Sequence, residues 1–177
     1  MHPDTVLLLQ RMHSVASTKK ELNIVLTRFG EVYKCLHKSQ DPKERFEAAW
    51  AMACIGDLYA RLNEPYEAES AYKKSIALFE KEGHLLNCAM VCLETAAFFR
   101  KVLLAVEAED MLKRRIVYRI RRLGAGHPDV LAAGEELIHF QRTDEIINAA
   151  THRWCKACNI DDYGIGFDLE NSDRAEK

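Results

Sequence analysis

A pair of cysteines near the carboxyl end, Cys155 and Cys158, has the spacing that metal sites and redox sites use. His152 precedes Cys155 by three positions, so three potential ligands would share one face of a helix. A structural zinc site needs four ligands, and the fourth would have to come from elsewhere in the chain. A redox motif would need a preceding strand, which this sequence does not predict. We therefore predict packing cysteines, with no metal and no cofactor, and keep zinc binding as a lesser alternative.

The six cysteines of the 177-residue chain favour a reducing compartment. Cys88 and Cys92 are four positions apart in an apolar pattern, where a free cysteine behaves as a small hydrophobic residue. No apolar run approaches the roughly 20 residues of a membrane span. The first residues lack the basic start and the cleavage site of a signal peptide. These features lead us to expect a soluble, cytoplasmic protein.

A His-Pro-Asp motif occurs twice, at residues 2–4 and 127–129. It is typical of a helix start, because proline suits the first turn and aspartate suits the positive end of the helix dipole. No Ser/His/Asp arrangement, no phosphate-binding loop ending in Gly-Lys-Ser/Thr and no HExxH metal motif is present. We therefore predict that the protein is not an enzyme.

Residues 113–122 carry six cations: Lys113, Arg114, Arg115, Arg119, Arg121 and Arg122. The simplest interpretation is a solvated outer helix face. Two functional interpretations remain open, a site for an acidic partner, including the protein's own tail, or a site for nucleic acid or an acidic membrane. Only Tyr118 is available for stacking on bases, and the net charge of the chain is −2, so nucleic acid is the weaker alternative.

Arg115 does not fit a solvated face, because the helical period places it on the apolar stripe. A buried arginine without a partner would cost several kcal/mol. We therefore predict an acidic partner on the following helix, either Glu135 or Glu136.

The helices that must position these groups are clearest between Ala49 and Phe79. Apolar or small residues recur there with a period near 3.6 at Ala68, Ala71, Tyr72, Ser75, Ile76 and Phe79. Pro65 suits a helix start, and Gly83 suits a helix end. The segment from about Arg45 to Leu62 is apolar on more than one side, so we expect it to pack against helices on two sides.

The hairpin resembles the tetratricopeptide repeat, in which a large-small pair, an aromatic residue and three further positions mark the packing contacts. Those positions are filled by Ile55, Gly56, Tyr59, Ala68, Tyr72 and Ser75. Starts at Pro3, Pro42, Leu85 and Pro128 give a period of about 42 residues. This long period, and the linker at residues 123–130, resemble the repeats of kinesin light chains.

The resemblance implies an all-α, right-handed solenoid of antiparallel helix pairs, with seven to eight helices over residues 1–158. We expect helices near 4–16, 20–38, 85–101 and 104–123, and a last pair starting at Pro128 and at Thr143. Residues 159–177 would form an acidic, flexible tail.

The resemblance further implies a non-catalytic adaptor or scaffold that binds a peptide or partner protein along the first helices of its repeats. No asparagine fills the positions that chaperone-binding members and kinesin light chains use, so we expect a different ligand. The mixed apolar and basic surface favours a partner with hydrophobic and acidic residues, and tail residues 163–170 have that character. The implied groove residues are Leu7, Gln10, Ser14, Trp50, Ala53, Asp57, Arg61, Met90, Leu93, Arg100, Lys101, Glu135, His139 and Arg142.

Overall fold

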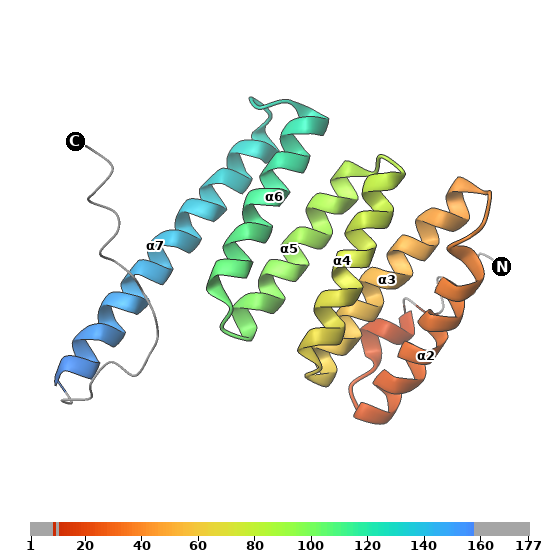
Figure 1. Cartoon of the computed structure of the whole chain (residues 1–177), viewed down its shortest axis with the longest axis horizontal. Coiled ribbons are helices and arrows are strands. Elements are labelled where there is room, and N and C mark those ends of the chain that lie inside the picture. Colours follow the sequence, from red (N-terminus) through yellow and green to blue (C-terminus); the bar gives the residue numbers. More distant parts are fainter. Residues whose placement is uncertain (1–8, 10, 158–177) are drawn as a thin grey trace. The chain divides into compact units, whose positions relative to one another are not determined.

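The computed structural model describes residue 9 and residues 11–157, with side chains placed up to residue 146. The described chain is all-α and contains no strand. It divides into two compact units, Met1–Ile138 and His139–Lys177, and each is described by itself. In the first unit, α2 to α6 lie side by side, each antiparallel to the next along the chain (Figure 1).

A short helical segment at 11–15 precedes the six helices for which bounds are known. These are α2 Lys19–Leu36, α3 Pro42–Leu62, α4 Pro65–Lys81, α5 Leu85–Lys101, α6 Ala105–Leu123 and α7 Pro128–Ala157. The helices expected near 20–38, 45–62, 65–82, 85–101 and 104–123 are thus confirmed. Of the first expected helix, near 4–16, residue 9 and residues 11–15 are helical, and residues 4–8 and 10 lie outside the described residues.

The prediction of a separate final helix from Thr143 is wrong, because α7 is one continuous helix. The sequence contains no glycine or proline between Glu135 and Ala157, so nothing interrupts the hydrogen-bond ladder. The Thr143 hydroxyl instead donates to the carbonyl oxygen of His139, one turn earlier, at 2.9 Å. Such a bond is compatible with an unbroken helix.

Local capping explains where two of the helices begin. At the start of α2, the Thr18 hydroxyl accepts from the Glu21 amide at 3.2 Å, and the Glu21 carboxylate accepts from the Thr18 amide at 3.0 Å. The backbone amides of Thr18 and then of Ser17 donate to the Glu21 carboxylate and lower its pKa to about 2. At the start of α3, Asp41 accepts from the Lys43 amide at 2.9 Å, with Pro42 in the first turn.

The turns that end α3 and α5 share an unusual backbone. Asn63 and Leu103 each have φ of 63°, in the left-handed region that favours glycine or asparagine. Leucine has no side-chain group to compensate for this conformation. The Leu103 side chain is also 89% exposed, so it contributes almost nothing to the core.

We expect Leu103→Gly to stabilise the protein by roughly 1 kcal/mol, because it removes the steric cost of a left-handed leucine without removing buried surface. The midpoint of urea unfolding, followed by far-UV circular dichroism, measures the change. Asn63→Gly is the matched control and should have little effect, since asparagine already tolerates the conformation. A destabilised Leu103→Gly variant would show that the expectation is wrong.

One hydrophobic cluster of the first unit joins buried residues of α2 and α3 with Ala71 of α4. Helix α3 contacts α2, α4 and α5, as its apolar residues on several sides predict. At Gly56 it lies close to α4, since an added Cβ would lie 2.7 Å from a ring carbon of Tyr72. The stripe predicted on α4, from Ala68 to Phe79, is buried throughout. Small residues on α3 therefore set the spacing of this helix pair.

Within the described part of the chain, no helix is both long enough and apolar enough to span a bilayer.

Candidate functional site

Asp57 and Arg61 lie one turn apart on α3 and contact the helical segment at 11–15. The Asp57 carboxylate is 3.0 Å from His13 Nε2 and 3.7 Å from the Arg61 guanidinium. The contact with His13, more than that with Arg61, holds the pKa of Asp57 below its ordinary value. Arg61 also donates to the carbonyl oxygens of His13, at 2.9 Å, and Ala16. Both side chains, which the sequence placed on the ligand-binding face, therefore also bind the end of this segment to α3.

Glu94 on α5 is a neighbour of this group that the sequence analysis missed. Partial desolvation, and then the negative charge of Asp57, raise the pKa of Glu94, whereas His13 lowers it, although the Glu94 side chain is exposed. Within the part of the chain that the structure describes, no ion pair or hydrogen bond involves the Glu94 side chain. The sequence did contain a signal that could have identified Glu94. It follows Met90 by four positions and therefore lies on the same face of the helix.

Apolar side chains with partial exposure accompany these charges on α3 and α5. Trp50 is partly buried against Phe79, with ring centroids 6.1 Å apart and the planes perpendicular. Met90 is also partly exposed, and Leu93 is 38% exposed. Ala53, in contrast, is buried in the helix packing, so its predicted place on the binding face is wrong.

The other predicted groove residues lie further along the chain. Arg100 and Lys101 are exposed at the end of α5. His139 and Arg142 are exposed on the part of α7 that belongs to the second unit. In the first unit, Ser14 and Glu135 are exposed as well. Leu7, Gln10 and the tail segment 163–170 lie outside the described residues.

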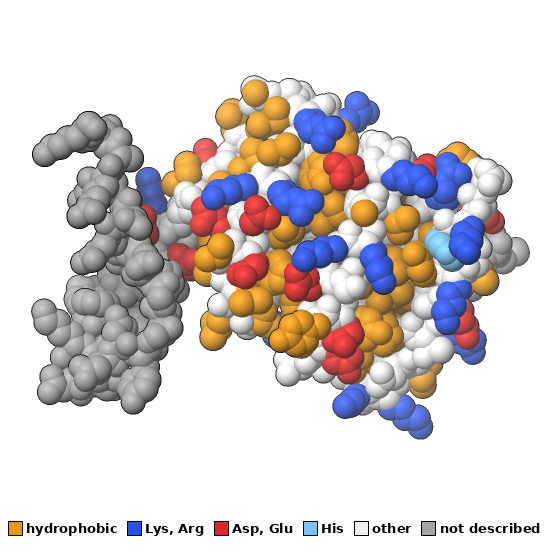
Figure 2. Space-filling model, in the orientation of Figure 1, with side chains coloured by type: hydrophobic (Ala, Val, Ile, Leu, Met, Phe, Trp, Pro, Cys, Tyr) orange, Lys and Arg blue, Asp and Glu red, His pale blue; other side chains and the backbone are white. Residues whose placement is uncertain are grey.

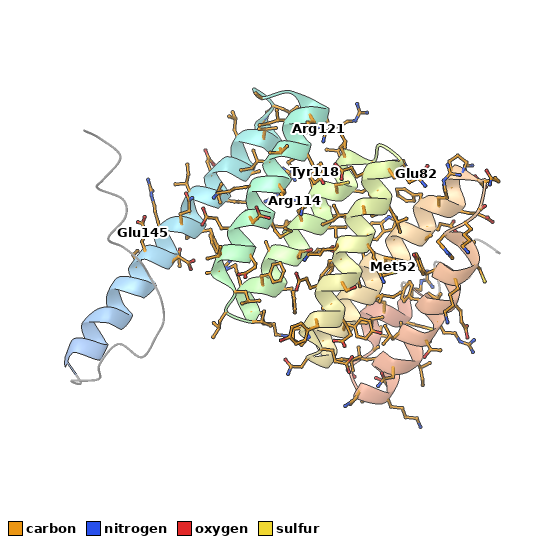
Figure 3. The ribbon with its side chains drawn as sticks, in the orientation of Figure 1. Met52, Glu82, Arg114, Tyr118, Arg121 and Glu145 are labelled. Carbon is orange, nitrogen blue, oxygen red and sulfur yellow. The ribbon has the colours of Figure 1, made fainter. Side chains whose placement is uncertain are left out.

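The cations of residues 113–122 lie on α6, among acidic groups. Figure 2 shows lysine and arginine side chains interspersed with acidic and apolar ones on the face in view. Four of the six have a defined contact with acidic residues or a carbonyl oxygen: Lys113 with Glu109 at 2.9 Å, Arg115 with Glu136, Arg119 with the Asp129 carbonyl oxygen at 2.7 Å, and Arg121 with Glu80 at 3.7 Å. Arg114 lies beside Tyr118, one turn along α6 (Figure 3), and Arg122 is exposed.

Arg115 is buried, with only 4% of its surface exposed, and it pairs with Glu136 on α7. The prediction of an acidic partner on the next helix is therefore confirmed, and the partner is the second of the two candidates. The Arg115 Nε atom is buried without a hydrogen-bond partner among the described residues. The ion pair with Glu136 is thus the principal interaction that stabilises the buried charge of Arg115.

The described cysteines of α5 have the environment of packing residues. Cys88 and Cys92 are fully buried, and burial raises the pKa of the Cys88 thiol to about 11 and that of Cys92 to about 12. Thiols with such pKa values stay protonated at neutral pH, so they are poor nucleophiles and poor metal ligands. Among the residues that the structure describes, no group of three or more His, Cys, Asp or Glu side chains could hold a metal ion. The side chains of Cys155 and Cys158 are not among them.

Comparison with known proteins adds no family to this description. No protein-family model matches the chain, and no curated protein is significantly similar to it.

Proposed function

We propose that the protein is a non-catalytic adaptor that binds a peptide, or an extended segment of a partner protein, on the face lined by α3 and α5. In this proposal the helix pairs form a right-handed, tetratricopeptide-like solenoid, and α3 and α5 are the first helices of neighbouring pairs. One observation carries the proposal. Helix α3 contacts α5 directly, although α4 separates them in sequence, and both helices have partly exposed apolar side chains at Trp50, Met90 and Leu93.

A correspondence between the two hairpins supports the repeat. A shift of 40 positions (103 − 63 and 108 − 68) relates Asn63 to Leu103 and Ala68 to Ala108. The first two residues share a φ of 63°, and the last two are both completely buried at the start of a second helix. Two hairpins with the same turn and the same close contact are what a structural repeat requires.

The alternative function, nucleic-acid binding through the cations of α6, has weaker support. Nucleic-acid binding depends on cations that are available to phosphates. Four of the six cations of α6 already contact acidic groups or a carbonyl oxygen, as described above. Peptide binding on the α3–α5 face therefore remains the proposal.

Selection from a displayed library of random dodecapeptides, with the full-length protein as bait, tests this function. We expect enriched peptides whose affinity falls about tenfold in Leu93→Asp and in Met90→Asp, because an aspartate there would be desolvated against the apolar part of the ligand. Leu103→Asp is the matched control, since Leu103 is an exposed leucine on a turn, and it should not alter binding. A library that yields no enriched peptide, or binders that lose affinity only in the control, would overturn the proposal.

A further inference from the structure

One edge of the helix array in the first unit has the most exposed apolar side chains. Because α2 to α6 alternate in direction, the turns before α2, between α3 and α4, and between α5 and α6 lie at the same edge (Figure 1). The four most exposed large apolar or aromatic side chains of the described residues lie at or beside these three turns: Leu103 at 89%, Tyr66 at 83%, Val15 at 75% and Val106 at 73%. Such a concentration of exposed apolar surface indicates a face that binds something outside the chain.

The turn between α5 and α6 has an unusual composition. Residues 102–106 are Val-Leu-Leu-Ala-Val, and Leu103, Leu104 and Val106 are exposed. The turns of the opposite edge consist of polar residues, glycine and alanine, at residues 37–41, 82–84 and 124–127. A run of exposed apolar residues does not help a chain to fold, so this turn indicates an external contact.

The backbone at Leu103 supports the same conclusion. Its φ of 63° lies in the left-handed region, where a leucine lowers the stability of the fold. Asn63, at the corresponding turn between α3 and α4, has the same φ and is a residue type that tolerates it. The fold alone would therefore favour glycine or asparagine at position 103. A strained residue that adds almost nothing to the core points to a function.

We propose that this edge inserts into the interface of a phospholipid bilayer, with Leu103, Leu104 and Val106 as its apolar anchor. Tyr66 and Val15 lie on the two other turns of the edge, so one flat apolar layer can contact all three turns. A protein partner would instead need a separate pocket for each turn. Tyrosine suits such an interface, because its ring is apolar and its hydroxyl group can stay among the headgroups.

The charges near these turns make the apolar anchor the main source of affinity. Lys101 is exposed at the end of α5, next to the anchor, and Lys19 and Lys20 are exposed at the start of α2. Glu67 and Glu107 are exposed beside the other two helix starts. Because cations and carboxylates are mixed, anionic headgroups should strengthen binding without being required for it.

Flotation of the full-length protein with lipid vesicles tests the proposal. The protein should bind vesicles of phosphatidylcholine, and bind more tightly when about a quarter of the lipid is phosphatidylserine. Leu103→Gly should weaken binding about tenfold, because it removes the most exposed apolar side chain of the anchor. The same variant should unfold at a higher urea concentration than the wild type, so weaker binding could not be explained by a damaged fold. Asn63→Gly is the matched control and should leave binding unchanged.

A pair of valines on α6 provides a second test. Val106→Asp should abolish vesicle binding, because it places a charge within the anchor. Val117→Asp introduces the same change at an exposed valine in the middle of α6, away from the edge, and should leave binding unchanged. Equal losses in the two variants would overturn the proposal.

Three further results would also overturn it. The first is a wild-type protein that binds neither kind of vesicle. The second is binding that requires phosphatidylserine and disappears at high salt, because charge alone would then explain it. The third is self-association of the wild type without lipid that Leu103→Asp removes, because a second copy of the chain would then cover the edge. Sedimentation velocity measures this association. Peptide binding on the α3–α5 face is measured without lipid, so its outcome is independent of these results.

Discussion

Glu136→Ala is expected to destabilise the protein by about 2–3 kcal/mol, because it leaves the Arg115 guanidinium buried without a countercharge. Removing one member of a fully buried ion pair costs more, but Glu136 is half exposed, so water replaces part of the lost interaction. Arg115 has no such access, with 4% of its surface exposed and one nitrogen already lacking a partner. The midpoint of urea unfolding measures the difference.

A variant at Arg115 shows whether the destabilisation by Glu136→Ala comes from the uncompensated charge of the arginine. Arg115→Met keeps most of the volume and removes the charge, so it should cost less than Glu136→Ala. The double variant should regain most of the stability that Glu136→Ala loses, which gives a large coupling energy. Glu135→Ala, at the adjacent exposed glutamate, is the control and should stay within about 0.5 kcal/mol of the wild type. Simple addition of the two single effects would contradict the ion-pair explanation.

The preceding hairpin shows why an arginine at this position is exceptional. Ser75 is the counterpart of Arg115 after the shift of 40 positions (115 − 75). It is completely buried, and its hydroxyl donates to the Ala49 carbonyl oxygen at 2.9 Å. A small residue therefore allows close helix packing there, whereas Arg115 extends to the next helix and joins α6 to α7.

The second large effect is expected for Gly56→Leu, which should destabilise the protein by about 3 kcal/mol through overpacking. Even a Cβ at this position would lie 2.7–2.9 Å from three ring atoms of Tyr72. The Tyr72 ring is buried and cannot move aside without displacing α4. Gly56→Ala should cost less, because the higher helix propensity of alanine, roughly 1 kcal/mol, offsets part of the strain.

Gly30 on α2 provides the control for this prediction, because an added Cβ would have no atom within 4 Å. Gly30→Ala should therefore stabilise the protein by up to about 1 kcal/mol. Thermal and urea unfolding of the three variants compare the two sites directly. If Gly56→Ala stabilised the protein as much as Gly30→Ala does, the close approach of α3 and α4 would not limit the packing.

The sequence predicted the helices well, because the start, the end and the buried stripe of a helix depend on residues that are close together in the chain. The 3.6-residue period identified the buried stripe of α4, and Pro65 and Gly83 bounded it. The same period identified Arg115 as a misplaced charge and restricted its partner to the next helix. The predicted break at Thr143 was wrong because no local signal supported it. It came from the resemblance, and no glycine or proline interrupts the helix there.

The candidate site was less predictable, because its properties depend on which side chains meet in space. Helical register predicted Arg61 on the binding face, but it could not show that the guanidinium binds carbonyl oxygens of the preceding segment. Glu94 was missed because the charges that act on it, those of Asp57 and His13, come from other segments of the chain. Charge counts along the sequence indicated a basic surface, whereas in the structure Arg61 is engaged by backbone carbonyl oxygens and by Asp57.

The buried thiols of α5 also allow local opening of the helix array to be measured by thiol labelling. Cys35 is exposed on α2 and can react with a maleimide in the folded state, whereas Cys88 and Cys92 are sealed beneath α4 and α6. A reagent reaches the latter pair only when α5 separates from its neighbours. The rate at which these two thiols are labelled therefore measures how often the centre of the helix array opens, without an engineered cysteine.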